Sequence, residues 1–139
     1  MQDKAMGLLG IMRKASALAI GEENTVDALK KGKVKLLILP SDASEKRKKD
    51  AELLLRGRNA ESVEVPYTGQ EIADALGIGG CSILAITDLG FASSFIANLP
   101  DTGQKYEEIS EALKRRLEKA KRRKRETALN GKKNQRGGE

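Results

Sequence analysis

Two aspartates are placed where a carboxylate can do acid–base chemistry. Asp42 and Asp88 each follow an aliphatic run and precede a helical pattern, and a positioned carboxylate can act as a general base. Helix N-capping explains both residues without any catalytic role. No second carboxylate or cluster of metal ligands is spaced to assist them. The sequence therefore favours a binding protein over an enzyme that acts through Asp42 or Asp88.

The remaining inventory of catalytic residue types is sparse. The 139 residues include no histidine, which removes the commonest general base near neutral pH and every Ser-His or Cys-His pair. The single cysteine, Cys81, excludes an internal disulfide and a cysteine-based metal site, and it reads as a small apolar filler at the start of a strand. We therefore expect no catalytic residue, no bound metal and no cofactor.

Polar side chains gather at the start of an expected helix, in the stretch GEENTVDALKKGK. Asn24 can both donate and accept at the edge of a base, whereas Glu22 and Glu23 can only accept. Asp27 precedes Lys31 by four residues, the spacing of an ion pair on one helix face. Two interpretations stay open: an ordinary helix whose acids compensate the helix dipole, or a contact surface with an unusual acidic start.

The glycine-rich stretch LGIGGCS invites comparison with phosphate-binding loops. It is not a dinucleotide fingerprint, because Ser82 occupies the position of the third small glycine and the stretch precedes its strand. It also lacks the Gly-Lys-Ser/Thr ending of a P-loop. A helix cap leading into a strand explains it, although glycines also let a backbone approach a ligand closely.

The charge of the chain is concentrated in residues 101–139. Residues 1–100 contain 13 Lys/Arg and 13 Asp/Glu, whereas residues 101–139 contain 13 and 7, so the second segment carries the whole net charge of +6. A solvated tail is one interpretation, but nine basic residues against one acid in residues 114–125 favour an arm that contacts nucleic acid. The candidate contacts in this arm are Lys114, Arg115, Arg116, Lys121, Arg122, Arg123, Lys124 and Arg125.

Helical and strand patterns alternate along residues 1–100. Helical spacing ends near Lys14, resumes before Gly32, and returns in a polar helix to about Arg56, in TGQEIADALG and in DLGFASSFIANL. ALAIG is a candidate edge strand, SVEVP a short strand, and VKLLILP and SILAIT strands buried on both faces. This order predicts an α/β fold, a three-layer α/β/α sandwich around a small mixed sheet of about four strands.

Beyond Pro100 the pattern changes. A narrow apolar stripe predicts a helix, at Tyr106, Ile109, Leu113, Leu117 and Ala120. The stretch TALNGKKNQRGGE has nothing to bury, so we expect it to be disordered. The predicted organisation is one folded domain over residues 1–100 and a basic tail over residues 101–139, helical in part and then disordered.

The sequence shows no membrane or export signal. No apolar run approaches the roughly 18 residues of a membrane span, and residues 1–10 lack the basic-then-apolar order of a signal peptide. We expect a soluble, cytoplasmic monomer without a membrane partner. The aromatic residues are two Tyr and two Phe, with the phenylalanines at core spacing, which argues against exposed rings that stack on single-stranded RNA.

The order of these motifs resembles a known family. The segments GLLGIMRKASALAIGEENTVDALKKGKVKLLILPSDAS, LGIGG and ILAITDLGFASSFIANL are similar to the ribosomal protein seven-Ae family of kink-turn RNA binders, in its bacterial YlxQ-type branch. The resemblance covers roughly residues 4–99 and leaves the basic tail outside. It implies an α/β/α sandwich with a binding face made of two loops. The implied RNA-contacting residues are Gly21, Glu22, Glu23, Asn24, Asp27, Lys30 and Lys31 in the first loop and Ile78, Gly79 and Gly80 in the second.

The first loop departs from the family pattern. Typical kink-turn binders place an Asn-Glu pair here and a lysine three residues after the Glu, and by register these positions are Glu23, Asn24 and Asp27. Only Asn24 keeps a side chain that both donates and accepts at a base edge. The resemblance therefore implies a kink-turn face retuned for another RNA, or for a protein.

These observations predict a non-enzymatic RNA-binding protein associated with the ribosome or another ribonucleoprotein. Its folded domain would recognise structured, kink-turn-like RNA, and its basic tail would add affinity. The expected partners are RNA and possible ribosomal or ribonucleoprotein proteins. The alternative is a protein-interaction module that keeps the fold and has lost kink-turn binding.

Overall fold

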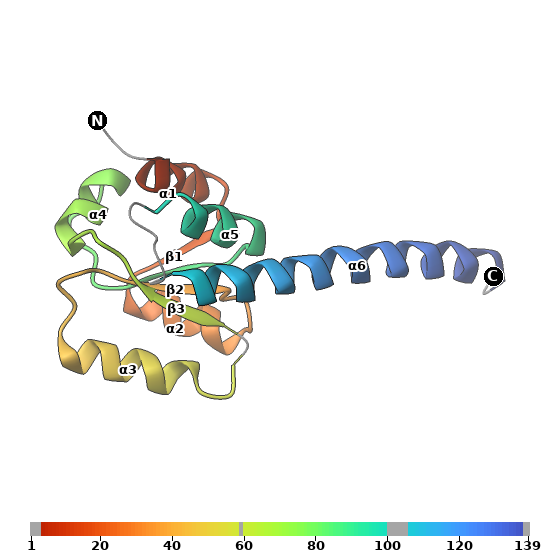
Figure 1. Ribbon diagram of the computed structural model, residues 1–139, viewed down its shortest axis with the longest axis horizontal. Coiled ribbons are helices and arrows are strands. Elements are labelled where there is room, and N and C mark those ends of the chain that lie inside the picture. The colour runs from red at the N-terminus through yellow and green to blue at the C-terminus, as the bar shows by residue number, and fades with distance from the viewer. Residues whose placement is uncertain (1–3, 59, 100–105, 138–139) are drawn as a thin grey trace.

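The described part of the chain forms six helices and a four-stranded sheet (Figure 1). The computed structural model describes residues 4–58, 60–99 and 106–137, with the backbone alone from residue 125 onward. The elements in chain order are α1 (Lys4–Lys14), β1 (Leu18–Ile20), α2 (Glu22–Lys30), β2 (Leu36–Leu39), α3 (Glu45–Leu55), β3 (Glu61–Glu64), α4 (Gly69–Leu76), β4 (Leu84–Ile86), α5 (Leu89–Ala97) and α6 (Glu107–Gly137).

The sheet has the strand order β1-β4-β2-β3. β2 pairs with β3 in parallel, whereas β4 pairs antiparallel with both β1 and β2. The two aliphatic runs therefore form the central strands, and the shorter runs form the edges. The prediction of a small mixed sheet of about four strands is confirmed.

The side chains of the central strands alternate between two apolar layers. Leu36 and Ile38 of β2, with Leu84 and Ile86 of β4, are fully buried on the face covered by α1, α4 and α5. Leu37 and Leu39 face the opposite layer, which α2 and α3 cover. Because successive residues of a strand point to opposite faces, a continuous aliphatic run fills both layers. The predicted three-layer α/β/α sandwich is confirmed.

Side-chain caps fix the starts of three helices. Ser44 accepts from the backbone N–H of Arg47, Thr68 forms a capping box with Glu71, and Asp88 accepts from the N–H of Phe91. Each cap satisfies a helical N–H that has no partner within its helix. The capping interpretation of Asp88 is thus confirmed.

The first turns of α6 belong to the core of the domain. Tyr106 is 3% exposed and Leu113 fully buried, and both join the layer that contains α1 and α5. The Tyr106 hydroxyl donates to the backbone carbonyl of Glu64 on β3, at 3.2 Å. The packed unit therefore extends past residue 100, where the sequence pattern alone suggested a boundary.

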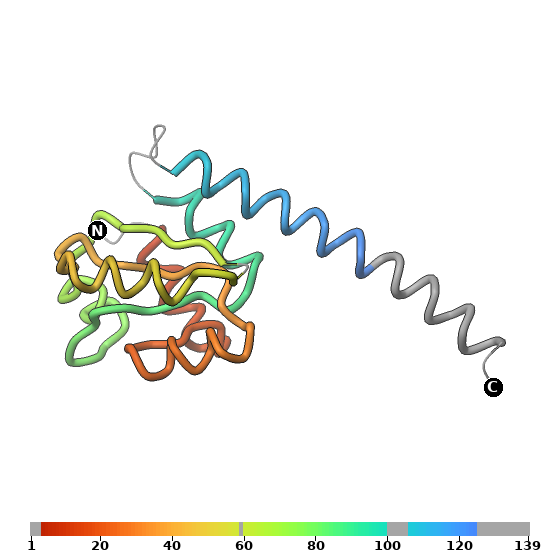
Figure 2. Tube along the Cα trace, turned by 90° about the horizontal axis from the view of Figure 1, so that it is seen from below, coloured from red at the N-terminus to blue at the C-terminus, as the bar shows by residue number. Residues whose placement is uncertain are grey.

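Beyond Leu117, α6 leaves the domain as a single projecting helix (Figures 1 and 2). Every side chain from Glu118 to Lys124 is exposed. The helical backbone continues to Gly137, whereas we expected disorder from Thr127 on; residues 138 and 139 lie outside the described residues. No proline interrupts residues 107–137, and many of these residues are Lys, Arg, Gln and Ala, which favour a helix even without an apolar stripe.

Candidate nucleic-acid interface

A glycine joins β1 to α2 beside the start of β4. Gly21 has φ 89° and ψ 164°, a backbone conformation that L side chains rarely adopt. Its N–H donates to the carbonyl of Ile83 at 3.0 Å, which extends the antiparallel pairing of Ile20 with Leu84 by one residue. The start of α2 therefore lies next to the segment that enters β4, three residues after the predicted 78–80 loop. We call residues 21–24 and 78–80 the loop face.

The acidic side chains of α2 are partly compensated by basic partners. Glu22 pairs with Arg47 of α3 at 3.2 Å, and Asp27 pairs with Lys31 at 3.1 Å, as the helical spacing predicted. Glu22, Asp27 and Lys31 are all more than half exposed, so each pair stabilises the protein by only about 0.2–1 kcal/mol. Glu23 is exposed, and no ion pair of its carboxylate is found within the described residues.

Asn24 is held at the start of α2 by its own amide. Its Nδ2 donates to the carbonyl of Ile20 at 2.9 Å, four residues earlier. An asparagine amide has two N–H donors and an accepting oxygen, so this bond orients the side chain and leaves capacity for another partner. Asn24 is exposed, which makes it a side chain of the loop face able to contact a base edge.

The glycines of the second loop leave its backbone uncovered. Gly77 ends α4 in the left-handed region, with φ 71°, while Ile78 packs against the core. Gly79 and Gly80 are exposed, and a Cβ added at either would meet nothing within 4 Å. Internal packing therefore does not require these two glycines, and their missing side chains leave the loop backbone open to a ligand.

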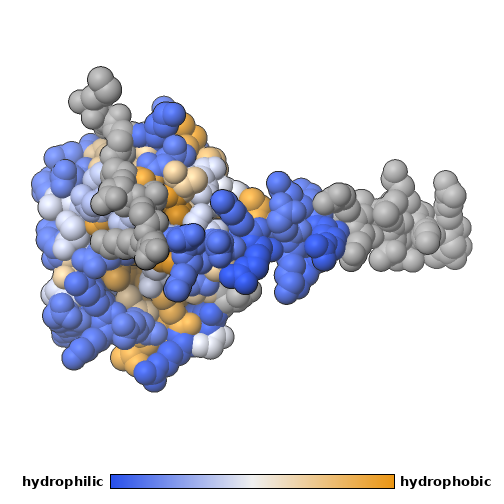
Figure 3. Space-filling view, in the orientation of Figure 1, coloured by the Kyte–Doolittle hydropathy of each residue, from blue (hydrophilic) through white to orange (hydrophobic). Residues whose placement is uncertain are grey.

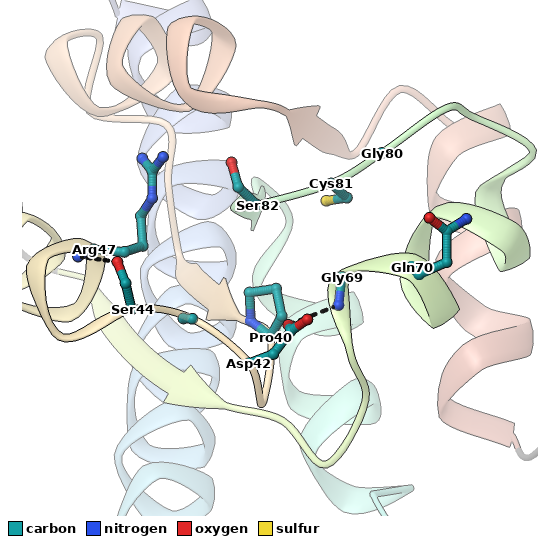
Figure 4. A pocket seen from close by; sticks show the side chains of 10 residues that line it. Pro40, Asp42, Ser44, Arg47, Gly69, Gln70, Gly80, Cys81 and Ser82 are labelled. Atoms are coloured by element: carbon teal, nitrogen blue, oxygen red, sulfur yellow. Dashed lines mark hydrogen bonds between the residues drawn. The ribbon is translucent and has the colours of Figure 1, made fainter.

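A depression of about 400 Å³ lies beside Gly80 (Figure 4). Its walls come from the turn after β2, the start of α3, the start of α4 and the loop before β4. The lining residues are Pro40, Asp42, Ala43, Ser44, Arg47, Gly69, Gln70, Gly80, Cys81 and Ser82. The sequence analysis did not identify Arg47, Gly69 or Gln70. In an antiparallel pair the end of one strand lies beside the start of the other, so the residues that follow β2 could have been expected near those that precede β4.

Asp42 does not cap the helix that follows it. Its Oδ1 accepts from the N–H of Gly69 at 3.0 Å, at the first turn of α4, while Ser44 caps α3. The capping interpretation of Asp42 was therefore wrong about the helix, because the partner lies 27 residues away in sequence. The carboxylate ties the turn after β2 to α4 and forms part of the wall of the depression (Figure 4).

Cys81 lies half-buried in the same wall. Burial raises the pKa of its thiol, an effect partly opposed by hydrogen bonding with the backbone of Ile83. Because the thiolate is the nucleophilic form, a raised pKa makes this cysteine less reactive. Its contact with the core fits the predicted role of a small apolar filler.

Gly69 allows α4 to approach the second loop closely. A Cβ at this position would lie 2.3 Å from the carbonyl oxygen of Cys81. We expect Gly69→Ala to lower the free energy of unfolding by about 1 kcal/mol, because the added methyl group would overlap this carbonyl oxygen. This is the low end of the usual cost of adding a group to a packed site, since the surface loop can shift. Urea unfolding measures the change, with Gly79→Ala as the control that meets open space. Equal stability of the two variants would contradict this close contact.

The other predicted contact residues lie away from the loop face. Lys30 and Lys31 are at the C-terminal end of α2, about 13 Å along the helix from Gly21 at 1.5 Å per residue. The basic residues 114–124 are on α6, which leaves the domain on the side away from α4 and the loop that follows it (Figures 1 and 2). Arg125 has no described side chain. The structure therefore separates the predicted contacts into the loop face, the remainder of α2 with Lys30 and Lys31 at its C-terminal end, and a projecting basic helix.

The parts of the chain that the structure describes contain neither a cluster of metal ligands nor a membrane-spanning helix. In residues 4–58, 60–99 and 106–137, no group of three His, Cys, Asp or Glu side chains could hold a metal ion. No helix among the described residues is long and apolar enough to cross a membrane.

The sandwich and the glycine-joined loop face together define a small α/β/α domain of the ribosomal-protein type. Residues 3–96 match the model of the ribosomal protein L7Ae/L30e/S12e/Gadd45 family, and the chain belongs to this family as a YlxQ-type member. The match ends before α6 begins.

Two known proteins are similar to about two thirds of this chain. The chain is 32% identical over 95 residues to a protein of Enterococcus faecium named "RNA-binding protein YlxQ", an alignment that covers 66% of this chain and 86% of the relative. It is also similar to a solved structure from Bacillus halodurans, described as a protein with unknown function. That likeness has a TM-score of 0.63 and 30% identity, and it covers 69% of this chain and 96% of the other.

Proposed function

We propose that this protein is a non-enzymatic, cytoplasmic RNA-binding protein that acts as a monomer in a ribosome-associated or other ribonucleoprotein complex. The observation that supports the proposal is the hydrogen bond from Gly21 to Ile83, which joins the start of α2 to the segment between the 78–80 loop and β4. Family membership and the name of the Enterococcus faecium relative support RNA as the ligand.

The loop face offers contacts suited to structured RNA. Gly79 and Gly80 expose backbone that a nucleotide can approach closely. The adjoining depression of about 400 Å³ is open enough for an unstacked base, the form in which RNA sequence is usually read. Asn24 and Gln70 supply amide donors and acceptors for a base edge, and the Arg47 guanidinium can contact a phosphate.

The proposal can be tested by crosslinking bound RNA in cells and sequencing it. Gly80→Val should keep wild-type stability, because a Cβ there meets open space and Gly80 lacks a positive φ. We expect it to reduce crosslinking at discrete structured RNA sites at least about fivefold, or about 1 kcal/mol, because the side chain blocks backbone approach.

The matched control is Gly7→Val, which adds the same side chain at an open position on α1. The control should retain the wild-type sites. Identical site profiles for the wild type and both variants would contradict RNA binding through the loop face, as would an absence of enriched sites in the wild type.

A protein-interaction module is the second candidate. The acidic side chains Glu22, Glu23 and Asp27 line a shallow groove with Val26 and Lys30 on the surface of α2, and negative charge there repels phosphate. This candidate predicts that removing the acids does not create kink-turn binding, which the first experiment of the Discussion measures.

A further inference from the structure

The basic part of α6 carries positive charge around its whole circumference. Between residues 114 and 124, the side chains of Lys114, Lys119, Lys121, Arg122 and Arg123 are all exposed. At 3.6 residues per turn, Lys114 and Lys121 share one side of the helix. Lys119 and Arg123 share the opposite side. A helix that lies flat on a surface uses one side only, so charge on both sides indicates a partner that surrounds the helix.

The side chains of this segment exclude two common partners. A helix lying on a lipid surface needs an apolar face, but the apolar residues from Lys114 to Lys124 are only Ala120 and Leu117, and Leu117 is half-buried at the domain edge. A single-stranded nucleic acid is held by rings that stack on its bases, and no aromatic residue follows Tyr106. With these two partners excluded, the charge pattern favours a partner that presents phosphates on two sides of the helix. The groove of a double-stranded nucleic acid has this arrangement.

We propose that residues 114–124 of α6 are a second RNA-binding site, which inserts lengthwise into a major groove of double-stranded RNA that a bulge or internal loop has widened. The groove must be widened because an A-form major groove is deep and narrow, whereas a helix with its side chains is about 10–12 Å across. This inference rests on RNA as the ligand, as proposed above, but not on the loop face.

The direction of α6 makes this site separate from the first. The helix extends away from the loop face in both views (Figures 1 and 2). Every side chain from Glu118 to Lys124 is exposed, and the coloured part of the helix is mostly hydrophilic on the side that Figure 3 shows. A short RNA element seated on the loop face therefore lies at the other end of the molecule from residues 114–124. The protein bridges two segments of a folded RNA, one at each end.

The test compares two double variants of the full chain with equal loss of charge. Lys114→Gln with Lys121→Gln clears one side of α6, and Lys119→Gln with Arg123→Gln clears the other. Binding of a bulged RNA hairpin is measured over a range of salt concentrations. Both variants should lower the salt slope by about two, because each lost phosphate contact lowers it by about one. Loss in one variant only, or in neither, would overturn groove insertion.

The choice of nucleic acid provides the second measurement. The wild-type chain should bind the bulged hairpin at least about tenfold more tightly than an unbroken RNA duplex, a single strand of the same composition or the corresponding DNA duplex. Equal or tighter binding of any of these three would overturn the proposal. Gly7→Val, which lies in neither proposed site, should leave binding of this hairpin unchanged. Failure of the α6 site is measured by the two double variants, and failure of the loop face is measured by the crosslinking sites that Gly80→Val removes.

Discussion

Replacing Glu23 by Asn and Asp27 by Lys is expected to tighten binding of a consensus kink-turn RNA at least about tenfold, or about 1.4 kcal/mol. The two substitutions restore the residues that typical kink-turn binders carry at these positions. They remove the negative charge of Glu23 in the first turn of α2 and that of Asp27 further along the helix. They also break the Asp27–Lys31 pair, which on an exposed helix contributes only about 0.2–0.5 kcal/mol. Hydrogen bonds to charged groups are worth about 1.5–3 kcal/mol, so the RNA contact should prevail.

The experiment is a titration of one labelled kink-turn RNA at fixed salt. All proteins carry Lys121, Arg122, Arg123 and Lys124 changed to Gln, so that α6 does not mask the effect. The control, Asp50→Lys with Glu52→Asn on α3, makes the same change in net charge. Tight binding by the parent protein would show that its acids do not oppose RNA. No gain over the control would favour the protein-interaction module.

Leu113→Ala is expected to lower the free energy of unfolding by about 2–5 kcal/mol, the usual cost of emptying a buried leucine site. Leu113 is fully buried between α6 and the layer that contains α5, although it lies in the segment first assigned to the tail. Leu117→Ala, at the half-buried edge of the same stripe, should cost less than about 1.5 kcal/mol because less apolar surface is lost.

Urea unfolding of the two variants measures this difference. Equal costs would mean that α6 packs on the domain no more tightly at Leu113 than at its edge. If the prediction holds, deleting residues 101–139 removes part of the core along with the basic residues. The contribution of the charge is then better measured by substitutions on α6 than by truncation.

The fold could be predicted largely from the sequence because its signals are local. A continuous aliphatic run such as VKLLILP can only be covered on both faces, and Thr68, Gly77 and Asp88 mark helix ends within a few residues. The resemblance also proposed both loops, and the pairing of β1 with β4 explains why Gly21 lies beside Ile83, which follows the second of them.

The rest of the site depends on contacts between distant residues. Asp42 reaches α4, and Gly69 accommodates the carbonyl of Cys81, through packing that no local pattern encodes. The apolar stripe of α6 was visible, but its partners on α5 and β3 were not. The density of positive charge predicted a basic arm but could not predict the direction in which that arm extends. In the structure α6 extends away from the loop face and carries the basic residues with it.

The bond from the Tyr106 hydroxyl to Glu64 helps to cover one edge of the sheet. Glu64 belongs to β3, an edge strand of four residues, and its side chain also pairs with Lys48 while α6 packs against the strand. The opposite edge, β1, is only three residues long. Short, charged and covered edges offer a neighbouring chain little backbone to pair with. A strongly basic helix favours a high local concentration of a protein along a polyanion, and one covered edge with one very short edge lets many copies crowd there without joining into a common sheet.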